Sequence, residues 1–436
     1  MESDISYPRS PIGALRGRIG ERVRIAGLID AIRDHKRVQF LVVRDASGVV
    51  QVVREKMPGD AGEEPLTACS AVEIIGAVRD APSVRLGGLE LAADELRVHS
   101  LAASPLPIAA ASVLEKQIDH RQISLRRPDQ QLILAVQTTL EHAMRHWWAR
   151  EGFTEIHSPK LMATFSESGA DAFAVKYFGR SAFLAQSPQF YKQMAIAGGI
   201  EKVFEIGPAF RAEPSFTARH ETEFTSIDME VAWIETHDDL LRLEEEWLAA
   251  AIAAVAGRHG AEIAALLGVE IAIPTSPFPR VTMEEAQAIV RASGHMPAKT
   301  DDLDPEGERR LSAHIADTFG HEFVFVTDYP ATARPFYHHR HDARPDLTRS
   351  FDLLFRGIEV TTGAQREHRY DVLRAQALER GYALEPLQSY LDFFRYGCPP
   401  HGGMGVGLAR LLMALLHRQS VREVTLLSRS PTRLTP

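Results

Sequence analysis

The chain has 436 residues, of which 45% are hydrophobic and 25% charged, and its formal net charge is −9. This composition is typical of a soluble globular protein with two or three domains, and the negative charge argues against indiscriminate binding to nucleic acids. The two cysteines, Cys69 and Cys398, are far apart and form no Cys-x-x-Cys pair. The sequence therefore indicates neither a disulfide framework nor a zinc site, and any metal ion should be held by oxygen atoms.

The sequence predicts neither a secretion leader nor a membrane-spanning segment. No basic stretch followed by an apolar one is found at the N-terminus, and the longest run of small apolar residues lies around 248–256. That run is shorter than the roughly 20 residues that cross a bilayer. We expect a cytoplasmic protein without membrane association.

The first 58 residues are basic although the whole chain is acidic. They contain eleven lysine and arginine residues against seven aspartate and glutamate residues. A basic module on an acidic body is typical of a protein that meets a polyanion at one end. A solvated strand surface would explain the same charge, so both interpretations stay open.

Residues 22–98 contain five short β-like segments and a hairpin turn at 45–48. The strands are expected at 23–27, 38–43, 49–53, 71–78 and 89–98. Five short strands in fewer than 100 residues are typical of an oligonucleotide-binding (OB) barrel. We expect an N-terminal domain at 1–101, followed by a linker or hinge at 102–125.

A second domain is expected from 126 to 436, because the hydrophobic period changes there. Apolar residues step by four from Leu132 to Met144, which predicts a helix that ends at Gly152. Residues 237–320 are mainly helical by pattern and resemble an insertion, with helices at 240–255, 283–292 and 306–318. Strands are expected at 153–156, 183–185, 203–206, 227–233, 323–327, 350–355 and 357–361. Hairpin-linked strands with flanking helices predict an antiparallel sheet covered by helices, so the fold class is α+β.

The predicted strand at 227–233 has apolar residues at odd positions and two carboxylates, Asp228 and Glu230, at even ones. One face should therefore belong to the core, and the other should present both acids. Two carboxylates on one strand face need a nearby cation or a cationic ligand, unless that face is exposed to solvent. The pattern leaves both possibilities open.

Four glycines lie within residues 402–407, and Arg410 follows as an apolar helical run begins. Glycine lets a backbone approach a flat ligand, and an arginine can lay its guanidinium on that ligand. The segment is a candidate nucleotide seat, although most glycine clusters are simple turns.

A second candidate cluster, at 210–224, consists of Arg211, Glu213, Arg219, His220 and Phe224 at the two ends of one predicted hairpin. The planar fork of arginine donates two parallel hydrogen bonds to a phosphate, and an aromatic face stacks on a base. Together these residues predict a site for a nucleoside triphosphate that is held at both ends.

Three segments in this order resemble the three motifs of class II aminoacyl-tRNA synthetases. Residues 152–159 resemble motif 1, Phe210 to Glu213 with Arg219-His220 resembles motif 2, and residues 402–410 resemble motif 3. The similarity covers nearly the whole chain and is greatest to the aspartyl-tRNA synthetases of the short, archaeal-type form. It implies an OB-fold anticodon-binding domain, a class II catalytic domain, and an aspartate–tRNA ligase that forms aspartyl-adenylate from ATP and L-aspartate.

The resemblance assigns roles in binding ATP. Arg211 would hold the α-phosphate, Glu213 would face the adenine edge, and Phe224 and Arg410 would enclose the purine; Arg211 and Arg410 would be catalytic. The implied ATP-binding set is Arg211, Glu213, Arg219, His220, Phe224, Glu359, Gly405, Gly407 and Arg410.

The resemblance also implies Mg²⁺ bound by hard oxygen ligands at Asp352, Glu359 and Thr362. For Asp352, a buried strand acid paired with an arginine is an alternative that stays open.

The implied aspartate-binding set is Glu167, Gln189, Lys192, Asp228, Thr362 and Arg366. Glu167 would receive the ammonium group, helped by Asp228 and Gln189, and Arg366 would clamp the side-chain carboxylate with Lys192 as a second cation. Related asparaginyl enzymes typically lack this lysine. A second positive charge beside a neutral amide would have no counter-charge, so Lys192 favours aspartate over asparagine.

In the barrel, the resemblance implies anticodon contacts from Arg33, Phe40 and Gln51, with the aromatic ring stacked on a splayed base. By its alternating strand alone, Phe40 would belong to the core. The implied partner is tRNA(Asp), whether tRNA(Asn) is also charged stays open, and motif 1 implies a homodimer.

The chain departs from the family pattern at several positions. These are Ala409 for the glutamate before the motif 3 arginine, Ser168 and Ala170 in the amino-acid loop, Leu28 for a tryptophan, and Leu427-Ser428-Arg429 for Phe-Pro-Arg. They keep a second hypothesis open, a paralogue that supplies activated aspartate or Asp-tRNA to a non-translational acceptor in specialised metabolism. A non-catalytic RNA-binding paralogue predicts loss of Arg211, Glu359 or Arg410, and all three are present.

Overall fold

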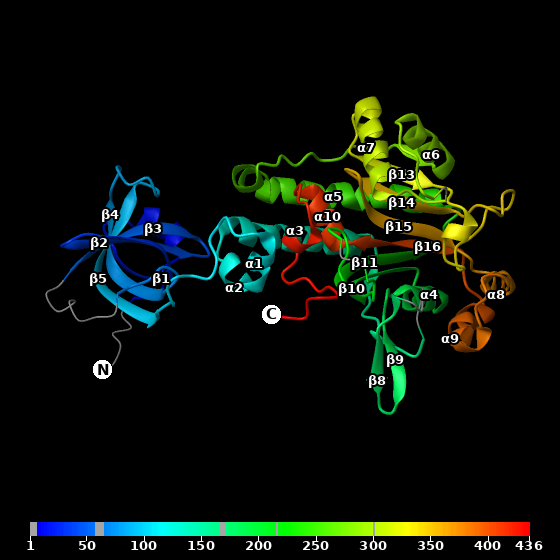
Figure 1. Ribbon diagram of the computed structural model, residues 1–436, viewed down its shortest axis with the longest axis horizontal. Coiled ribbons are helices and arrows are strands. Elements are labelled where there is room, and N and C mark those ends of the chain that lie inside the picture. The colour runs from blue at the N-terminus through cyan, green and yellow to red at the C-terminus, as the bar shows by residue number, and fades with distance from the viewer. Residues whose placement is uncertain (1–6, 57–64, 165–170, 215–216, 300) are drawn as a thin grey trace. The chain divides into compact units, whose positions relative to one another are not determined.

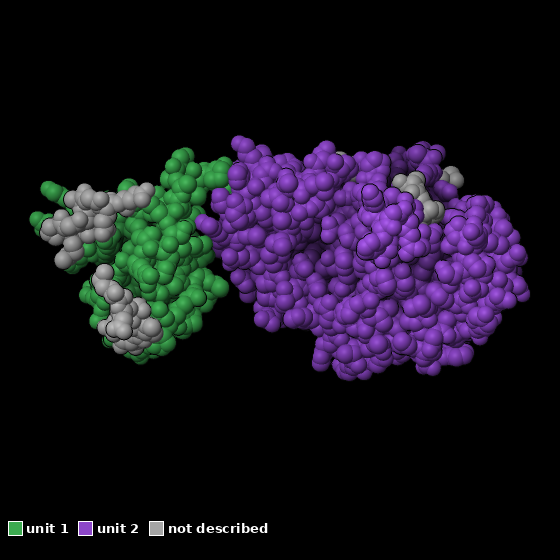
Figure 2. Space-filling view, turned by 90° about the horizontal axis from the view of Figure 1, so that it is seen from below, with its two compact units in different colours: residues 1–109 green, residues 110–436 purple. Residues whose placement is uncertain are grey.

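The computed structural model describes residues 7–56, 65–164, 171–214, 217–299 and 301–436. The chain divides into two compact units, residues 1–109 (unit 1) and residues 110–436 (unit 2), which Figure 2 colours separately. Unit 1 has a hydrophobic core of its own, and the largest core of unit 2 is separate from it.

Unit 1 is a closed five-stranded barrel, as predicted from the sequence. Its strands are β1 (Arg22–Asp34), β2 (Val38–Asp45), β3 (Gly48–Glu55), β4 (Ala71–Asp80) and β5 (Leu89–Ser100), preceded by the short helix η1 (Ile12–Arg18). Their order around the barrel is β1-β2-β3-β5-β4, with β3 and β5 parallel. The predicted hairpin turn forms because Oδ1 of Asp45 accepts hydrogen bonds from the backbone N–H groups of Ser47 and Gly48.

Unit 2 is built on an eight-stranded sheet (Figure 1) with the order β12-β13-β14-β15-β16-β11-β10-β6. The strands are β6 (Thr154–Glu155), β10 (Lys202–Phe210), β11 (Glu223–Ala232), β12 (Arg280–Thr282), β13 (Phe323–Thr327), β14 (Ser350–Phe355), β15 (Ile358–Arg366) and β16 (His401–Gly407). Neighbours pair antiparallel, as predicted, except at the two edges, where β12–β13 and β10–β6 are parallel. A smaller sheet has the order β7-β9-β8 and contains β7 (Leu161–Met162), β8 (Ala174–Tyr177) and β9 (Arg180–Leu184).

Two long helices, α3 (Pro128–Arg150) and α5 (His237–Leu267), pack against each other and contribute to the main core with the sheet and α10 (Leu408–Leu415). The stripe that begins at Leu132 and includes Met144 is buried, as the period of four predicts, and the helix ends before Gly152, whose φ is +82°. The other helices of unit 2 are α1 (Leu114–Asp119), α2 (Arg121–Ser124), α4 (Gln189–Ala197), α6 (Met283–Ala292), α7 (Pro305–Phe319), η4 (Ala331–Ala333), α8 (Tyr370–Glu379), α9 (Leu384–Arg395) and η5 (Val421–Glu423).

Two parts of the expected domain plan need correction. Residues 114–124, assigned to the linker, form α1 and α2 and belong to unit 2, because the buried Arg121 donates hydrogen bonds to the carbonyl oxygens of Thr425 and Leu426. Residues 237–320 are mainly helical, as expected, but they are not separate from the main sheet and core, as an insertion would be. They include the edge strand β12, and α5 contributes buried side chains to the main core.

Among the described helices, only α5 is long and apolar enough by length and composition to cross a membrane. In the most apolar stretch of α5, 22% is buried. The helix nevertheless contributes Leu240, Trp247 and Ile252 to the main core. Packing against α3 accounts for the apolar character of the buried side of this helix.

The two acids of β11 are buried. Asp228 and Glu230 are 3% and 0% exposed, and Lys192 and Arg366 supply the positive charges that they need. The expectation of nearby cations is therefore confirmed, and the alternative of a solvent-exposed strand face is wrong.

Candidate active site

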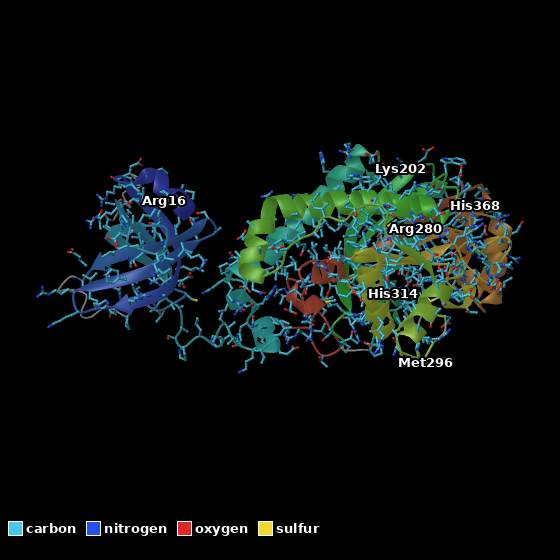
Figure 3. The ribbon with its side chains drawn as sticks, turned by 90° about the horizontal axis from the view of Figure 1, so that it is seen from above. Arg16, Lys202, Arg280, Met296, His314 and His368 are labelled. Carbon is cyan, nitrogen blue, oxygen red and sulfur yellow. The ribbon has the colours of Figure 1, made fainter. Side chains whose placement is uncertain are left out.

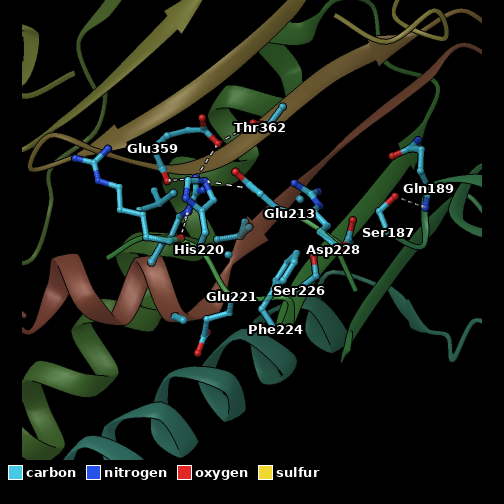
Figure 4. A pocket seen from close by; sticks show the side chains of 18 of the residues that line it. Ser187, Gln189, Glu213, His220, Glu221, Phe224, Ser226, Asp228, Glu359 and Thr362 are labelled. Atoms are coloured by element: carbon cyan, nitrogen blue, oxygen red, sulfur yellow. Dashed lines mark hydrogen bonds and ion pairs between the residues drawn. The ribbon is translucent and has the colours of Figure 1, made fainter. Parts of the chain in front are cut away.

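A cavity of about 400 Å³ lies over the middle of the sheet in unit 2. The β10–β11 hairpin, β15, β16, the start of α10 and the segment 334–338 all contribute lining residues. Figure 4 shows Glu359 and His220 toward one end, and Ser187 and Gln189 toward the other. The first end is called the hairpin end below, and the second the Arg366 end.

The glycine run at 402–407 is not a turn but strand β16, which lies inside the sheet. Two different structural reasons explain its glycines. A Cβ on Gly403 would overlap the carbonyl oxygen of Met229 and Oε2 of Glu230, and one on Gly402 would lie 2.7 Å from the side chain of Ile234. These two positions therefore require glycine for packing. Gly405 and Gly407 line the cavity and leave that part of its wall without side chains.

At the hairpin end, positive and aromatic side chains meet. The guanidinium carbon of Arg211 lies 5.4 Å from the centre of the Phe224 ring, and Nε2 of His220 lies 3.8 Å from a carboxylate oxygen of Glu213. Burial, and then the charge of Arg410, lower the pKa of His220. A neutral imidazole adds no further positive charge beside these arginines.

Arg219 and Arg410 are oriented by carboxylates. Arg219 is paired with Glu308 and donates a hydrogen bond to the carbonyl oxygen of Gly357, 2.9 Å away. Arg410 extends from α10 and donates a hydrogen bond of 3.2 Å to Oε1 of Glu359. Burial, and then the neighbouring Glu359, contribute to a pKa of about 7 for Glu308, although the charge of Arg219 acts in the opposite direction.

The acids above β15 form a group that could hold a cation. Glu359 and Thr362 line the cavity, and Oγ1 of Thr362 lies 3.3 Å from Oε1 of Glu359. Asp352 pairs across the sheet with Thr362, but its carboxylate is buried, and its Oδ2 accepts a hydrogen bond of 2.6 Å from Arg334. Partial burial, and then Asp352, raise the pKa of Glu359. Because Oδ1 of Asp352 is buried without a partner and Glu359 faces the cavity, the oxygen donors fit a divalent cation.

At the other end, Arg366 is buried beneath the cavity and oriented from several sides. It donates hydrogen bonds to Glu230, His338, Gln189 and the carbonyl oxygen of Gly403, at 3.0, 3.0, 3.2 and 2.9 Å. Burial would raise the pKa of Glu230, but Arg366, and then Lys192, outweigh burial and lower it. The guanidinium is thus fixed and charged at the floor of the cavity.

Lys192 does not line the cavity. Its ammonium group is fully buried and lies 2.8 Å from Oδ1 of Asp228 and 3.4 Å from Oε2 of Glu230. It also donates to the carbonyl oxygens of Met229 and Met404. Lys192 therefore neutralises the acids of β11 rather than facing the cavity as a second cation beside Arg366.

The cavity brings together most of the residues that the sequence suggested. They are Gln189, Arg211, Glu213, Arg219, His220, Phe224, Asp228, Glu359, Thr362, Arg366, Gly405, Gly407 and Arg410. Lys192 and Asp352 lie behind its wall, and Glu167 lies outside the described residues.

Sequence reasoning missed one wall of the cavity. Arg334, Tyr337 and His338 line it, as do Ser187 and Ser226. A dense run of arginine, aromatic and histidine residues at 334–340 was an available signal. These residues follow no regular helix or strand periodicity, and only the tertiary structure brings the segment against β15.

In unit 1, Arg33, Phe40 and Gln51 lie on the outer surface of the barrel. Arg33 is the cross-strand partner of Phe40, and Gln51 pairs with Val42, two residues further along β2. Phe40 is half-buried, and its ring meets the ring of His35 edge-on at 5.8 Å, whereas the neighbouring Leu41 is fully buried. The default expectation that Phe40 belongs to the core is therefore wrong, and its ring lies partly exposed on the barrel surface.

Comparisons with known proteins agree with both units. Residues 114–431 match the family model of class II tRNA synthetases (D, K and N), and residues 23–98 match that of the OB-fold nucleic acid binding domain. The chain is 41% identical to the aspartate–tRNA(Asp/Asn) ligase of Aeropyrum pernix, over 98% of each chain. It is 38% identical to the aspartate–tRNA(Asp) ligase of Pyrococcus abyssi, over 96% and 97% of the two chains. The solved asparaginyl-tRNA synthetase of Pyrococcus horikoshii with asparaginyl-adenylate superposes with a TM-score of 0.88 at 32% identity, covering 96% of this chain and 97% of the other.

Proposed function

The chain belongs to the class II aminoacyl-tRNA synthetases, among the aspartyl-tRNA synthetases of archaeal type, and on that basis we propose that its cavity holds ATP at the hairpin end and L-aspartate at the Arg366 end. The protein is an aspartate–tRNA ligase. One observation supports the assignment of the two ends. A single cavity is lined at one end by the exposed Arg211 and the partly buried Arg219 and Arg410, and at the other end by the buried Arg366, which four hydrogen-bond acceptors orient.

The reaction in this arrangement has two steps. The α-carboxylate of aspartate attacks the α-phosphorus of ATP, the bond to the leaving diphosphate breaks, and aspartyl-adenylate forms. A hydroxyl at the 3′ end of tRNA then attacks the activated carbonyl, and AMP leaves. No covalent enzyme intermediate is required, so positioning and charge neutralisation supply the acceleration.

Arg211 is the residue that we assign to the α-phosphate, because it projects into the cavity beside Phe224. Phe224 and Arg410 would enclose the purine, and Glu213 would meet its edge. Arg219 and His220 would meet the outer phosphates. Arg219 is paired with Glu308, so phosphate binding would exchange one anionic partner for another.

Mg²⁺ is the cation that we assign to Glu359 and Thr362, with Asp352 behind them, and it would neutralise phosphate charge during the first step. Arg334 already pairs with one oxygen of Asp352, which leaves Oδ1 as the atom free to face a cation.

At the Arg366 end, we assign the side-chain carboxylate of aspartate to Arg366 and the ammonium group to Asp228, Gln189 and Glu167. Asp228 lines the cavity and is already paired with Lys192. Lys192 would therefore act on the substrate through the carboxylates of β11.

We propose tRNA(Asp) as the acceptor, with Arg33, Phe40 and Gln51 on the barrel as the anticodon contacts. Charging of tRNA(Asn) is a second candidate, favoured by the 41% identical relative named for both acceptors. A homodimer formed through the motif 1 region, in which α3 leads to the edge strand β6, and a cytoplasmic location complete the proposal.

The test is ATP–diphosphate exchange with aspartate and with asparagine, followed by aspartylation of tRNA(Asp) and tRNA(Asn) transcripts. Exchange with aspartate alone, together with charging of tRNA(Asp), is expected. Failure of exchange would contradict the assignment of the cavity. Exchange without charging of either tRNA would favour the second hypothesis, a paralogue that hands activated aspartate to another acceptor.

A further inference from the structure

Outside the cavity, three side chains that can bind a metal ion converge where β15 ends. His339, Glu367 and His368 each offer one donor atom, and these atoms lie within 4.8 Å of one another. His339 and Glu367 are 5% and 1% exposed. Nδ1 of His368 is buried without a hydrogen-bond partner, whereas the buried Nδ1 of His339 has only the carboxylate of Glu367 beside it. Because a buried nitrogen without a partner costs free energy, Nδ1 of His368 would be stabilised by a ligand, and the contact of His339 with Glu367 places two further donor atoms beside it.

The backbone fixes these side chains from two chain segments. The N–H of His339 donates to the carbonyl oxygen of Gln365 at 3.0 Å, and the N–H of Glu367 donates to that of Tyr337 at 2.9 Å. Residues 337–339 thus lie alongside the end of β15, and His368, labelled in Figure 3, follows that strand before α8 begins. The donors are held close together by the fold itself rather than by a mobile loop tip.

The donor set suits a particular class of metal ion. Nδ1 of His339 lies 3.3 Å from Oε2 of Glu367. In a tetrahedral site with bonds of about 2.1 Å, neighbouring donor atoms are about 3.4 Å apart. Two imidazoles and one carboxylate suit Zn²⁺, Co²⁺ or Ni²⁺, whereas Mg²⁺ prefers oxygen donors alone.

We propose that His339, Glu367 and His368 bind a divalent transition-metal ion of the Zn²⁺ class, with water at the remaining coordination position. This site is distinct from the Mg²⁺ site assigned to Glu359 and Thr362 and does not depend on the proposed function.

Arg369 is the competitor for this ion. Its guanidinium donates hydrogen bonds to both oxygens of Glu367, at 2.8 and 2.7 Å, and its side chain is 48% exposed. A metal ion must displace Arg369 from at least one of these oxygens. Removing the arginine should therefore strengthen metal binding, whereas removing a histidine should weaken it.

The position of the site links it to the cavity. His338 precedes His339 in the sequence, and Arg366 precedes Glu367. These two residues form an isolated β-bridge and a side-chain hydrogen bond with each other, and both line the cavity. A bound ion would fasten together the two backbone segments that carry the Arg366 end. The ion would thus act as a structural clip behind that end, rather than as a participant in the reaction.

Titration of Co²⁺ into chelator-treated, untagged protein tests the proposal, with Mg²⁺ in excess and the visible d–d absorption of Co²⁺ as the signal. One ion per chain is expected in the wild type. His339→Ala and His368→Ala should each weaken binding about tenfold or more, Arg369→Ala should strengthen it, and the exposed His314→Ala should not change it. In parallel, Zn²⁺ should raise the melting temperature of the wild type and of His314→Ala, but not that of the two ligand variants.

Wild-type protein without a Co²⁺ spectrum would overturn the proposal, as would equal binding by His339→Ala, His368→Ala and His314→Ala. Weaker binding in Arg369→Ala would also contradict it, because the arginine would then support the site rather than compete for Glu367. Arg369→Ala keeps all three proposed ligands, so the test stays decisive even where a histidine variant fails to fold. None of these outcomes bears on ATP–diphosphate exchange, so the metal site and the proposed function are tested separately.

Discussion

Arg366 shows how a single side chain can define one end of the cavity. Four acceptors, from α4, β11, β16 and the segment 334–338, hold its guanidinium in one orientation. Lysine carries the same charge but cannot donate in the same fork. The chemistry of this position therefore depends on geometry as well as on charge.

Arg366→Ala is expected to abolish aspartate-dependent ATP–diphosphate exchange, and Arg366→Lys to reduce it at least about 100-fold, because lysine leaves Glu230 and Gln189 without their partner. The measurement is kcat/KM for aspartate at saturating ATP. Wild-type exchange in Arg366→Ala would refute the assignment of the carboxylate clamp.

Glu244 provides a residue-scale prediction about pH. Its carboxyl group, on α5, is fully buried, accepts a hydrogen bond from Thr361, and has one oxygen without a partner. Burial, and then Glu245 and Asp352, raise its pKa to about 8, although the hydrogen bond from Thr361 acts in the opposite direction. A carboxyl group whose pKa is higher in the folded than in the unfolded protein destabilises the fold as the pH rises from 4.5 toward 8.

The free energy of unfolding should therefore decrease by about 3 to 4 kcal/mol between pH 5 and pH 8 through this group alone. Glu244→Gln mimics the protonated acid and keeps an acceptor for Thr361, so its stability should fall less over the same range. Urea unfolding of both proteins at pH 5, 6, 7 and 8 measures the difference. Parallel pH profiles for the two proteins would show that Glu244 does not titrate as described.

At the scale of elements, strand β16 has two structural roles. It pairs with β15 on one side and β11 on the other, and it forms part of the cavity wall. Gly402 and Gly403 allow close packing within the sheet, because they leave room for the side chains of Ile234 and Glu230. Gly405 and Gly407 form part of the cavity wall.

Gly403→Ala is expected to destabilise the protein by about 3 kcal/mol or more, because the added methyl group would displace Glu230 and the neighbouring strand. The matched control is Gly257→Ala, within helix α5, where a Cβ would have no neighbour within 4 Å. That substitution should stabilise the protein by about 1 kcal/mol. Denaturation midpoints measure both effects, and equal midpoints would contradict the packing argument.

The same strand shows what the sequence could predict. Segments with a clear hydrophobic period were located to the residue, namely 283–292, 323–327 and 350–355. β16 was interpreted as a nucleotide seat or a turn, because glycine has no preference for a strand and only the neighbours of this segment make it one. The short helices α1 and α2 were missed for a similar reason, since the hydrogen bonds of Arg121 connect them to residues about 300 positions away.

In the candidate site too, residues in sequence motifs could be predicted, whereas residues placed by tertiary contacts could not. Arg211, Phe224, Glu359 and Arg410 were predictable because each belongs to a motif with its own spacing. Lys192 was expected in the cavity, but its side chain is buried beside the carboxylates of β11. Sequence spacing does not show toward which neighbours a long side chain on a helix extends. His338 belongs to an irregular segment, and only the bridge to Arg366 brings it to the site.

At the scale of the whole molecule, the division into two units separates recognition from chemistry. The proposed anticodon contacts belong to unit 1, and every residue that lines the cavity belongs to unit 2. Each proposed task should therefore respond to substitutions in its own unit.

Phe40→Ala is expected to reduce charging of tRNA(Asp) about 10-fold or more, through the loss of base stacking, and to leave ATP–diphosphate exchange unchanged. Phe319→Ala, an exposed aromatic residue of α7 that is 61% accessible, serves as the control and should affect neither reaction. Exchange that falls together with charging would indicate that Phe40 supports folding rather than RNA binding.

The strand order has a consequence for biosynthesis. β16 is the last strand of the large sheet along the chain, yet it lies between β15 and β11. While a ribosome is still translating the codons before His401, the facing edges of β11 and β15 have no partner, and such edges can pair with other chains. The sheet of unit 2 therefore closes only near the end of translation, whereas the barrel of unit 1 can fold long before. Premature release of the nascent chain upstream of this strand should yield an aggregation-prone product rather than a partly active enzyme.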